Sequence, residues 1–167
     1  MSATKKARLA VVGLGPGDPR YLTPEADAAL AAADVLYGYG PYLDRLTQRP
    51  SATVWSPLEY ACHVRDVYRI YDERLELMLT RDDPLYQNWD QDASAVTDRY
   101  NEQSPATVER ELAEAAARLA DRFDTVSGDQ WSRPGRRSDG KRFTIESFAR
   151  YMIHDPIHHL HDVGYPT

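Results

Sequence analysis

The hydrophobic positions from residue 55 onward recur at helical spacing and predict three helices. The first begins at Ser56, where Ser-Pro-Leu-Glu forms a capping box with proline at the first helical position, and it runs to about Leu79. The second opens at Ser104, and the third has Thr144 as its N-cap. The side chains expected to point inward are Tyr60, Val64, Val67, Tyr71, Leu75 and Met78, then Val108, Leu112, Ala116, Leu119 and Phe123, and finally Phe148, Met152, Ile157 and Leu160.

Two connections of different character join these helices. After the first helix, the run from Tyr86 to Asp92 is polar with scattered aromatic residues, and we expect it to be a loop. After Gly128, a glycine-rich basic connection leads to the last helix. Its Asp139-Gly140 pair favours a short hairpin there.

The first fifty residues have another pattern, which predicts one strand and one helix. A short apolar run from Leu9 to Val12 precedes a glycine-rich turn, and Thr23-Pro-Glu opens an alanine-rich helix. A parallel sheet needs several such units to bury both faces, and only one is present. The sequence therefore predicts a mainly α fold, with a helical domain over residues 52–167 and an incomplete strand-turn-helix appendage over residues 1–50.

The composition excludes several classes of partner. With 26 acidic and 20 basic residues the net charge is −6, which does not favour binding to nucleic acid. No apolar stretch approaches the length of a membrane span and no secretory signal is evident, so we expect a cytoplasmic protein without membrane contact. The single cysteine, Cys62, excludes an internal disulfide and is expected to be a buried structural residue. The oligomeric state stays open, with a homodimer as one option.

All five histidines fall in two places, which points to a metal site. His63 lies on the first predicted helix, and His154, His158, His159 and His161 lie on the last one. His154 and His158 are four residues apart, so a helix stacks them on one face, where they can bind the same ion. His63 would complete a set of three imidazoles with one open coordination position, as in a catalytic site. The alternative is a polar helix face that is only solvated.

Further residues are candidates for supporting such a site. Asp66 lies one turn after His63 and Asp162 one turn after His158, so both are candidate acceptors that fix the tautomers of the imidazoles. The alternative for both is a solvated helix face. Pro156 lies between the two predicted ligands and lacks the amide that would bond to the carbonyl of the preceding turn, so we expect a kink there.

A dense basic run precedes the last helix and is a candidate for binding acidic groups. Most such runs are simply solvated, but this one leads directly into the helix that carries the histidines. We expect Arg136 and Arg137, with Tyr151 at the rim of the site, to bind the carboxylates of an acidic substrate or a thiol cosubstrate. The whole run comprises Arg133, Arg136, Arg137, Lys141 and Arg142.

From about Trp55 to Val163 the chain resembles the DinB-like superfamily of four-helix bundles, which includes mycothiol-dependent maleylpyruvate isomerase and related thiol S-transferases. The matching residues are Trp55-Ser-Pro-Leu-Glu with His63, Trp131 before the basic connection, and His154-Asp-Pro-Ile-His-His on the last helix. The resemblance implies a four-helix bundle in which His63, His154 and His158 bind a divalent metal in the core. It carries over His159 only as a neighbour, and His161 stands where relatives often have glutamine.

The resemblance also implies cofactors. The metal is expected to be zinc, with nickel or iron as alternatives, and the incoming ligand is a low-molecular-weight thiol such as mycothiol. A metal with an open position can hold a thiol as thiolate or lower the pKa of bound water toward neutrality. The residues name no catalytic base.

The run from Leu9 to Glu25, followed by Ala33-Asp-Val-Leu-Tyr-Gly-Tyr-Gly-Pro, resembles the opening of the precorrin C17-methyltransferases, which use S-adenosylmethionine. The resemblance stops near Pro50, so we interpret the chain as a fusion, natural or constructed, without methyl transfer. We hypothesise that the fragment's helix occupies the place of the first bundle helix. Its apolar side consists of Ala26, Ala29, Leu30 and Ala33.

Three functions are therefore open. The first is a metal-dependent enzyme, either a thiol S-transferase or a hydrolase. The second is a non-catalytic metal-binding bundle, which a fourth ligand from His159 or His161 would favour. The third is a protein related to tetrapyrrole methylation. Only the third predicts affinity for S-adenosylmethionine.

Overall fold

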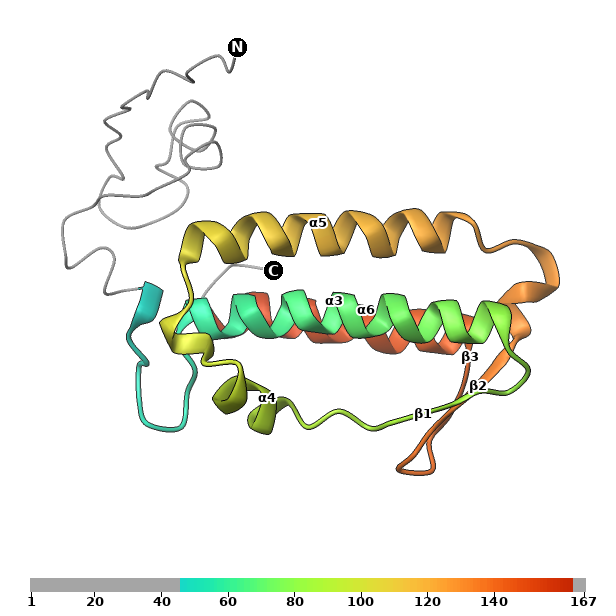
Figure 1. Cartoon of the computed structure of the whole chain (residues 1–167), viewed down its shortest axis with the longest axis horizontal. Helices are drawn as coiled ribbons and strands as arrows, with labels where there is room; N and C mark the ends of the chain where they lie inside the picture. The colour runs from blue at the N-terminus through green and yellow to red at the C-terminus, as the bar shows by residue number, and fades with distance from the viewer. Residues whose placement is uncertain (1–45, 164–167) are drawn as a thin grey trace, which may run out of the picture. The chain divides into compact units, whose positions relative to one another are not determined.

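The computed structural model describes residues 46–163 of the chain (Figure 1). The strand predicted at residues 9 to 12 and the alanine-rich helix after it lie outside this range, as does most of the predicted appendage. The division of the chain near residue 50 stays a prediction. Within the described part, no helix is long and apolar enough to cross a membrane.

Three long helices lie side by side, and the first of them contacts the other two (Figure 1). They are α3 (Pro57–Thr80), α5 (Pro105–Asp124) and α6 (Ile145–Asp162). Helices α3 and α5 run in the same direction because the connection between them returns along the length of the bundle, whereas α6 runs the opposite way (Figure 1). The returning connection carries β1 (Leu85–Tyr86), α4 (Gln91–Thr97) and the short helix η2 (Tyr100–Glu102).

The helices begin where their capping residues predict. Ser56 accepts a hydrogen bond from the Glu59 amide at 3.2 Å, and the Glu59 carboxylate accepts one from the Ser56 amide at 2.9 Å. Thr144 caps α6 in the same way, accepting from the Ser147 amide at 3.2 Å. These reciprocal bonds satisfy amides that have no partner within the helix. The predicted helix starts are confirmed, including Ser104 before α5.

A small sheet precedes α6 and packs near the end of α3. It has the strand order β1-β2-β3, with β2 (Pro134–Arg137) parallel to β1 and antiparallel to β3 (Arg142–Thr144). The predicted hairpin at Asp139-Gly140 is confirmed, and Gly140 has a φ of 92° that favours glycine. A Cβ atom on Gly135 would lie 2.8 Å from Cγ of the fully buried Met78, so the hairpin approaches α3 this closely because residue 135 is glycine.

The core lies along α3, and most of the predicted inward positions belong to it. Buried residues of α3 include Val67, Tyr71, Leu75 and Met78, while Tyr60 and Val64 are half-buried. Val108 and Leu119 of α5 are buried as predicted, and Leu112, Ala116 and Phe123 are half-buried. The segment from Tyr86 onward is more ordered than the predicted loop, because Tyr86, Ala95 and Tyr100 are buried in it. These three buried residues are too few among their polar neighbours to show a helical or strand period in the sequence.

The second half of α6 departs from the predicted pattern. Phe148 and Met152 are buried as expected, but Ile157 and Leu160 are 49% and 45% exposed, so the prediction that they point inward is wrong. A regular helix places Pro156 on the same face as Met152, and Pro156 is buried. After Met152 the inward positions are Pro156 and His159, each one residue before the predicted Ile157 and Leu160. The helix continues through Pro156 to Asp162.

Replacing Glu59 by glutamine should destabilise the fold by about 1–2 kcal/mol at neutral pH, because Glu59 is buried, caps α3 and accepts a charge-assisted bond from Arg49 at 2.6 Å. Burial raises the pKa of Glu59, but the bonds from Arg49 and Ser56 outweigh it and the pKa is lowered. The stabilisation is thus present above the unfolded pKa of 4.5 and lost as the pH falls through the folded value.

Urea unfolding of the parent and E59Q measures this effect. The difference in unfolding free energy between the two proteins should be largest at neutral pH and shrink in strongly acidic buffer. An equal difference at both pH values would contradict the assigned role.

Candidate metal centre

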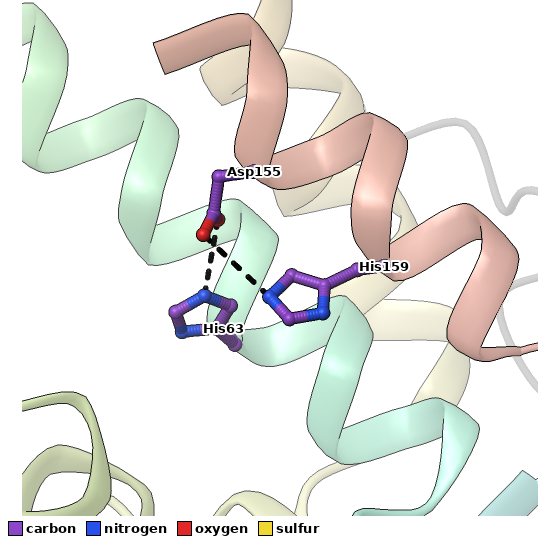
Figure 2. A group of neighbouring side chains, drawn as sticks. All are labelled: His63, Asp155 and His159. Carbon is purple, nitrogen blue, oxygen red and sulfur yellow. Dashed lines mark hydrogen bonds and ion pairs between the residues drawn. The ribbon is translucent and has the colours of Figure 1, made fainter. Parts of the chain in front are cut away.

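Three possible metal ligands converge between α3 and α6. His63 comes from α3, and Asp155 and His159 come from α6, four residues apart on one helix face (Figure 2). One ligand atom from each residue lies within 4.8 Å of the other two. Because α3 and α6 are antiparallel, the beginning of α3 meets the end of α6, and this brings the three side chains together (Figure 1).

His63 is buried among aromatic rings. Its side chain is 1% exposed, its ring stacks on Trp89 with centroids 5.2 Å apart, and Trp55 lies at 5.4 Å. Nε2 of His63 lies 3.1 Å from Oδ2 of Asp155. Nδ1 is buried and has no hydrogen-bond partner within the described residues. The ring is therefore held by packing, with Nε2 toward the other two candidate ligands (Figure 2).

His159 is oriented by two carboxylates. Its Nδ1 lies 2.9 Å from Oδ2 of Asp162, and its Nε2 lies 3.6 Å from Oδ1 of Asp155. A proton on Nδ1 donated to Asp162 leaves the lone pair of Nε2 facing Asp155 and His63. The ring of Tyr60 packs on His159, with centroids 4.9 Å apart. Asp162 thus fixes the tautomer that a metal ligand requires.

The charges of the site stabilise an ionised carboxylate. Burial raises the pKa of Asp155, but the hydrogen bonds with His159 and His63 outweigh burial and hold the pKa well below its usual range. For His159 burial lowers the pKa, and the contacts with Asp155 and Asp162 raise it above the ordinary value. In the metal-free protein His159 therefore retains a proton to higher pH than a free imidazole.

The donor set fits a divalent transition metal. Ligand atoms about 2.1 Å from a tetrahedral ion lie about 3.4 Å apart, close to the 3.1 and 3.6 Å separations between the imidazole nitrogens and the Asp155 oxygens. Two imidazoles and one carboxylate suit zinc and iron, and three protein ligands leave a position open. The unpartnered, buried Nδ1 of His63 also shows that no described residue holds this ring by a second hydrogen bond.

The structure gathers a different set from the one predicted. Of His63, His154 and His158, only His63 belongs to the group, since His154 and His158 are exposed and their rings stack on each other at 6.0 Å. His161 is also exposed. The difference has the same cause as the exposed apolar residues of α6: a helix phase set by Phe148 and Met152 turns residues 155 and 159 inward. The predicted set stays a prediction until metal is measured.

The other predicted residues have identifiable partners. Asp162 contacts His159 instead of supporting His158 alone, from which it is 3.9 Å away. Asp66 accepts hydrogen bonds from Arg65 at 2.9 Å and from the Tyr100 hydroxyl at 2.7 Å. The first bond lies within α3, and the bond from Tyr100 ties α3 to the connection before α5. Cys62 is buried, and burial raises the pKa of its thiol to about 12, as expected of a structural cysteine.

The basic residues lie along the small sheet. Arg136 pairs with Asp83 at 2.9 Å, and Arg137 pairs with Asp139 at 2.8 Å. The guanidinium of Arg137 lies 5.8 Å from the centre of the Tyr151 ring. Tyr151 lies one helical turn before Asp155 on α6. Arg137 and Tyr151 are therefore in contact with each other near the predicted rim, whereas Arg136 faces the turn after α3.

Sequence reasoning missed Asp155 as a ligand and named His159 only as a possible fourth ligand, and it missed Trp89 and Tyr60 as parts of this site. A signal for the first two was present, because Phe148, Met152, Asp155 and His159 follow one helical period. Trp89 had no such signal. It reaches His63 only because the long connection returns along the bundle.

A helical bundle that directs imidazoles and a carboxylate inward from facing helices has the architecture of bundle proteins that hold metals in their cores. The family comparison agrees: the DinB superfamily model matches residues 42–163, and the chain belongs to that superfamily. The solved structure of YfiT from Bacillus subtilis, described as a probable metal-dependent hydrolase with an unusual four-helix bundle topology, is similar with a TM-score of 0.66. The likeness covers 95% of this chain and 89% of YfiT at 17% identity, which confirms the four-helix bundle fold.

A short stretch is similar to proteins of another kind. It is 60% identical over 42 residues to a precorrin-3B C(17)-methyltransferase of a Sinorhizobium species. It is 56% identical over 41 residues to the cobalamin biosynthesis protein CobIJ of Mycobacterium bovis. Each match covers 25% of this chain, but only 16% and 8% of those two proteins. The predicted resemblance to a methyltransferase fragment is confirmed.

The two aspartates predicted to support the metal should behave differently when replaced by asparagine. Asp162→Asn should weaken metal affinity about tenfold, because Asp162 orients a ligand. Asp66→Asn should leave metal affinity unchanged and cost about 1–3 kcal/mol of unfolding free energy, because it breaks a half-buried charged network. Metal titration and urea unfolding of both variants measure the contrast, and a loss of metal affinity in D66N would refute it.

Proposed function

We propose that the protein is an enzyme that binds one divalent metal through His63, Asp155 and His159. The observation that carries this proposal is the convergence of three ligand atoms within 4.8 Å, with one of them on a fully buried imidazole. Burying an ionised carboxylate is costly unless its charge is balanced, and a metal ion bound there would balance the charge of the half-buried Asp155. The family membership supports the proposal, as does the description of YfiT as a probable metal-dependent hydrolase.

A metal bound there would supply Lewis acidity, lowering the pKa of a water or thiol that occupies the open position. Asp155 is the most exposed of the three proposed ligands, with a side chain 36% exposed, so a substrate would approach the site from the side of Asp155. A proton on Nδ1 of His159, donated to Oδ2 of Asp162 at 2.9 Å, would keep the Nε2 lone pair directed into the site. Trp55 and Trp89 exclude water from the other faces of His63.

The reaction class is a transfer or hydrolysis in which the activated group attacks an electrophilic substrate. A thiol cosubstrate and a water molecule are both compatible with three protein ligands and an open position. Zinc is our proposal for the metal, with iron as the alternative that two imidazoles and a carboxylate also suit. Methyl transfer is not proposed, because the matched methyltransferase segment is a small fraction of that enzyme.

Metal content of the purified, untagged protein tests the ligand set. The parent should bind near-stoichiometric metal, and His63→Ala and His159→Ala should each lose it, because each removes one of three ligands. The double variant H154A/H158A is the matched control, since it removes two imidazoles from the same helix but from its exposed face. Elemental analysis after dialysis against trace metal gives the readout, with circular dichroism to confirm folding.

Each pattern of results has one meaning. Metal retained by H154A/H158A and lost by the other two variants supports the proposed set. Metal lost by H154A/H158A and retained by His159→Ala would establish the set predicted from the sequence. A metal-free parent would overturn the proposed function.

Cobalt substitution separates the thiol reaction from the water reaction. A thiolate bound to cobalt gives an intense near-ultraviolet absorption, whereas loss of a proton from bound water changes the visible bands as the pH rises. We expect a small thiol such as 2-mercaptoethanol to produce the thiolate absorption in the parent and not in His159→Ala. Spectra that respond to pH but not to thiol would assign the protein to the hydrolases.

A further inference from the structure

A buried arginine on α3 has no counter-ion. Arg74 is 7% exposed and donates one hydrogen bond, from Nη2 to the carbonyl of Gln87 at 2.7 Å. Within residues 46–163, no carboxylate lies within ion-pair distance of its guanidinium. Burial lowers the pKa of Arg74. A buried charge without a partner is costly, so its presence needs a physical explanation.

The groups around Arg74 add a second unsatisfied atom. Its guanidinium lies 5.0 Å from the centre of the Tyr86 ring and 5.9 Å from that of Tyr71, within the range of a cation–π contact. The hydroxyl of Tyr86 is buried and has no hydrogen-bond partner among the described residues. An unpartnered buried hydroxyl beside an uncompensated cation indicates a missing group that accepts hydrogen bonds.

More positive charge faces the same place from the hairpin. Arg137 is only 12% exposed and lies near enough to Arg74 for the two charges to repel, while Lys141 lies 5.1 Å from the centre of the Tyr151 ring. Asp139 is the one carboxylate that pairs with this group in the described part of the chain, and both of its oxygens face Arg137. We call Arg74, Arg137 and Lys141, with Tyr86 and Tyr151, the arginine–tyrosine cluster. Its three cations share one anion in a protein whose net charge is −6.

We infer that the arginine–tyrosine cluster is an anion-binding site, which holds the carboxylate or phosphate group of a small acidic substrate. Guanidinium groups bind such oxyanions with two parallel hydrogen bonds, and the Tyr86 hydroxyl supplies a further donor. The bound oxyanion would neutralise Arg74 and satisfy Tyr86 at once. The sequence did not indicate Arg74 and Tyr86 as parts of such a site, whereas it predicted that Arg136, Arg137 and Tyr151 bind acidic groups.

Helix α6 and the segment from Tyr86 to Trp89 contribute residues both to the arginine–tyrosine cluster and to the metal centre. Tyr151 precedes Asp155 by four residues on α6, a rise of about 6 Å. The segment from Tyr86 to Trp89 runs from the cluster to the ring that stacks on His63. Three extended residues span at most about 10 Å, and His63 and Arg74 are eleven residues apart on α3, a rise of about 16 Å. These two spans set the scale of the separation between the two sites. The segment is fixed to the hairpin, because the Asn88 amide donates to Ser138 Oγ at 2.8 Å.

The substrate class follows from this arrangement and rests on the proposed metal-dependent function. The substrate would be a small acid whose anionic group binds at Arg74 and Arg137, while an electrophilic carbon on the order of 10 Å away reaches the metal. An anchored acid of this kind gains from orientation, because the distance between the two sites selects where the activated nucleophile attacks.

Calorimetric titration of the metal-free, full-length protein tests the site without relying on the metal. The probes are succinate, inorganic phosphate and neutral succinamide. Succinate or phosphate should bind to the parent and succinamide should not. Arg74→Gln and Arg137→Gln should each weaken the binding at least tenfold, and Arg150→Gln is the matched control, because Arg150 is exposed and pairs only with Glu146 on the same helix.

The outcomes decide between the two oxyanions and test the proposal. Tighter binding of succinate assigns a carboxylate, and tighter binding of phosphate assigns a phosphorylated substrate. No anion binding by the parent, or unchanged binding in both folded arginine variants, would overturn the site. Arg137 lies on the hairpin outside the main helices, so R137Q keeps the test decisive if R74Q does not fold.

One further variant separates this proposal from the metal function. His63→Ala should lose metal and still bind the oxyanion, because His63 is not part of the cluster. If the parent binds the oxyanion but neither the parent nor any variant binds metal, the arginine–tyrosine cluster remains an anion-binding site and the proposed metal-dependent function is refuted. If the parent binds metal but no oxyanion, the proposed metal-dependent function stands and the anion-binding site is refuted.

Discussion

The structure depends on α3 being buried along its length and on several sides. Cys62, Leu75 and Met78 are fully buried, and the helix contacts α4, α5 and α6. The charged side chains on its buried faces cannot reach water, so each of these must find a partner inside the protein. The described partners are Arg49 for Glu59, Asp66 and Glu111 for Arg65, and Arg122 for Asp72. Among the described residues Arg74 has no such counter-ion, and His63 contacts a carboxylate through Nε2 alone. In our proposals a ligand binds at each of these two places.

The direction of the helices explains how the site is assembled. Because the connection after α3 returns along the bundle, α5 starts beside the beginning of α3, where Tyr100 and Val108 pack against Cys62. The same return places Trp89 on His63. A short connection would have made α5 antiparallel to α3 and left the aromatic wall of the site without its residues. The length of the connection thus has a function that its polar composition does not reveal.

Features that depend on neighbouring residues in the sequence could be predicted, whereas features that depend on tertiary contacts could not. Capping boxes at Ser56 and Thr144 depend on neighbouring residues alone, so the sequence located both helix starts correctly. The inward face of α6 depends on which residues meet α3, and two apolar residues, Ile157 and Leu160, suggested the wrong face. The choice of His154 and His158 came from their spacing of four residues and from the family resemblance. Arg74 could not be found from the sequence, because an arginine within a helix is ordinarily solvated.

The aromatic surroundings of His63 have an optical consequence. The protein has three tryptophans, and two of them, Trp55 and Trp89, lie within 5.4 Å of the His63 ring centre, whereas Trp131 stacks on Phe123. Two of the three indoles therefore lie beside a candidate ligand. A paramagnetic ion at that position would quench the emission of both indoles at close range and leave the third as an internal reference. The protein thus carries its own reporter of occupancy, without a label.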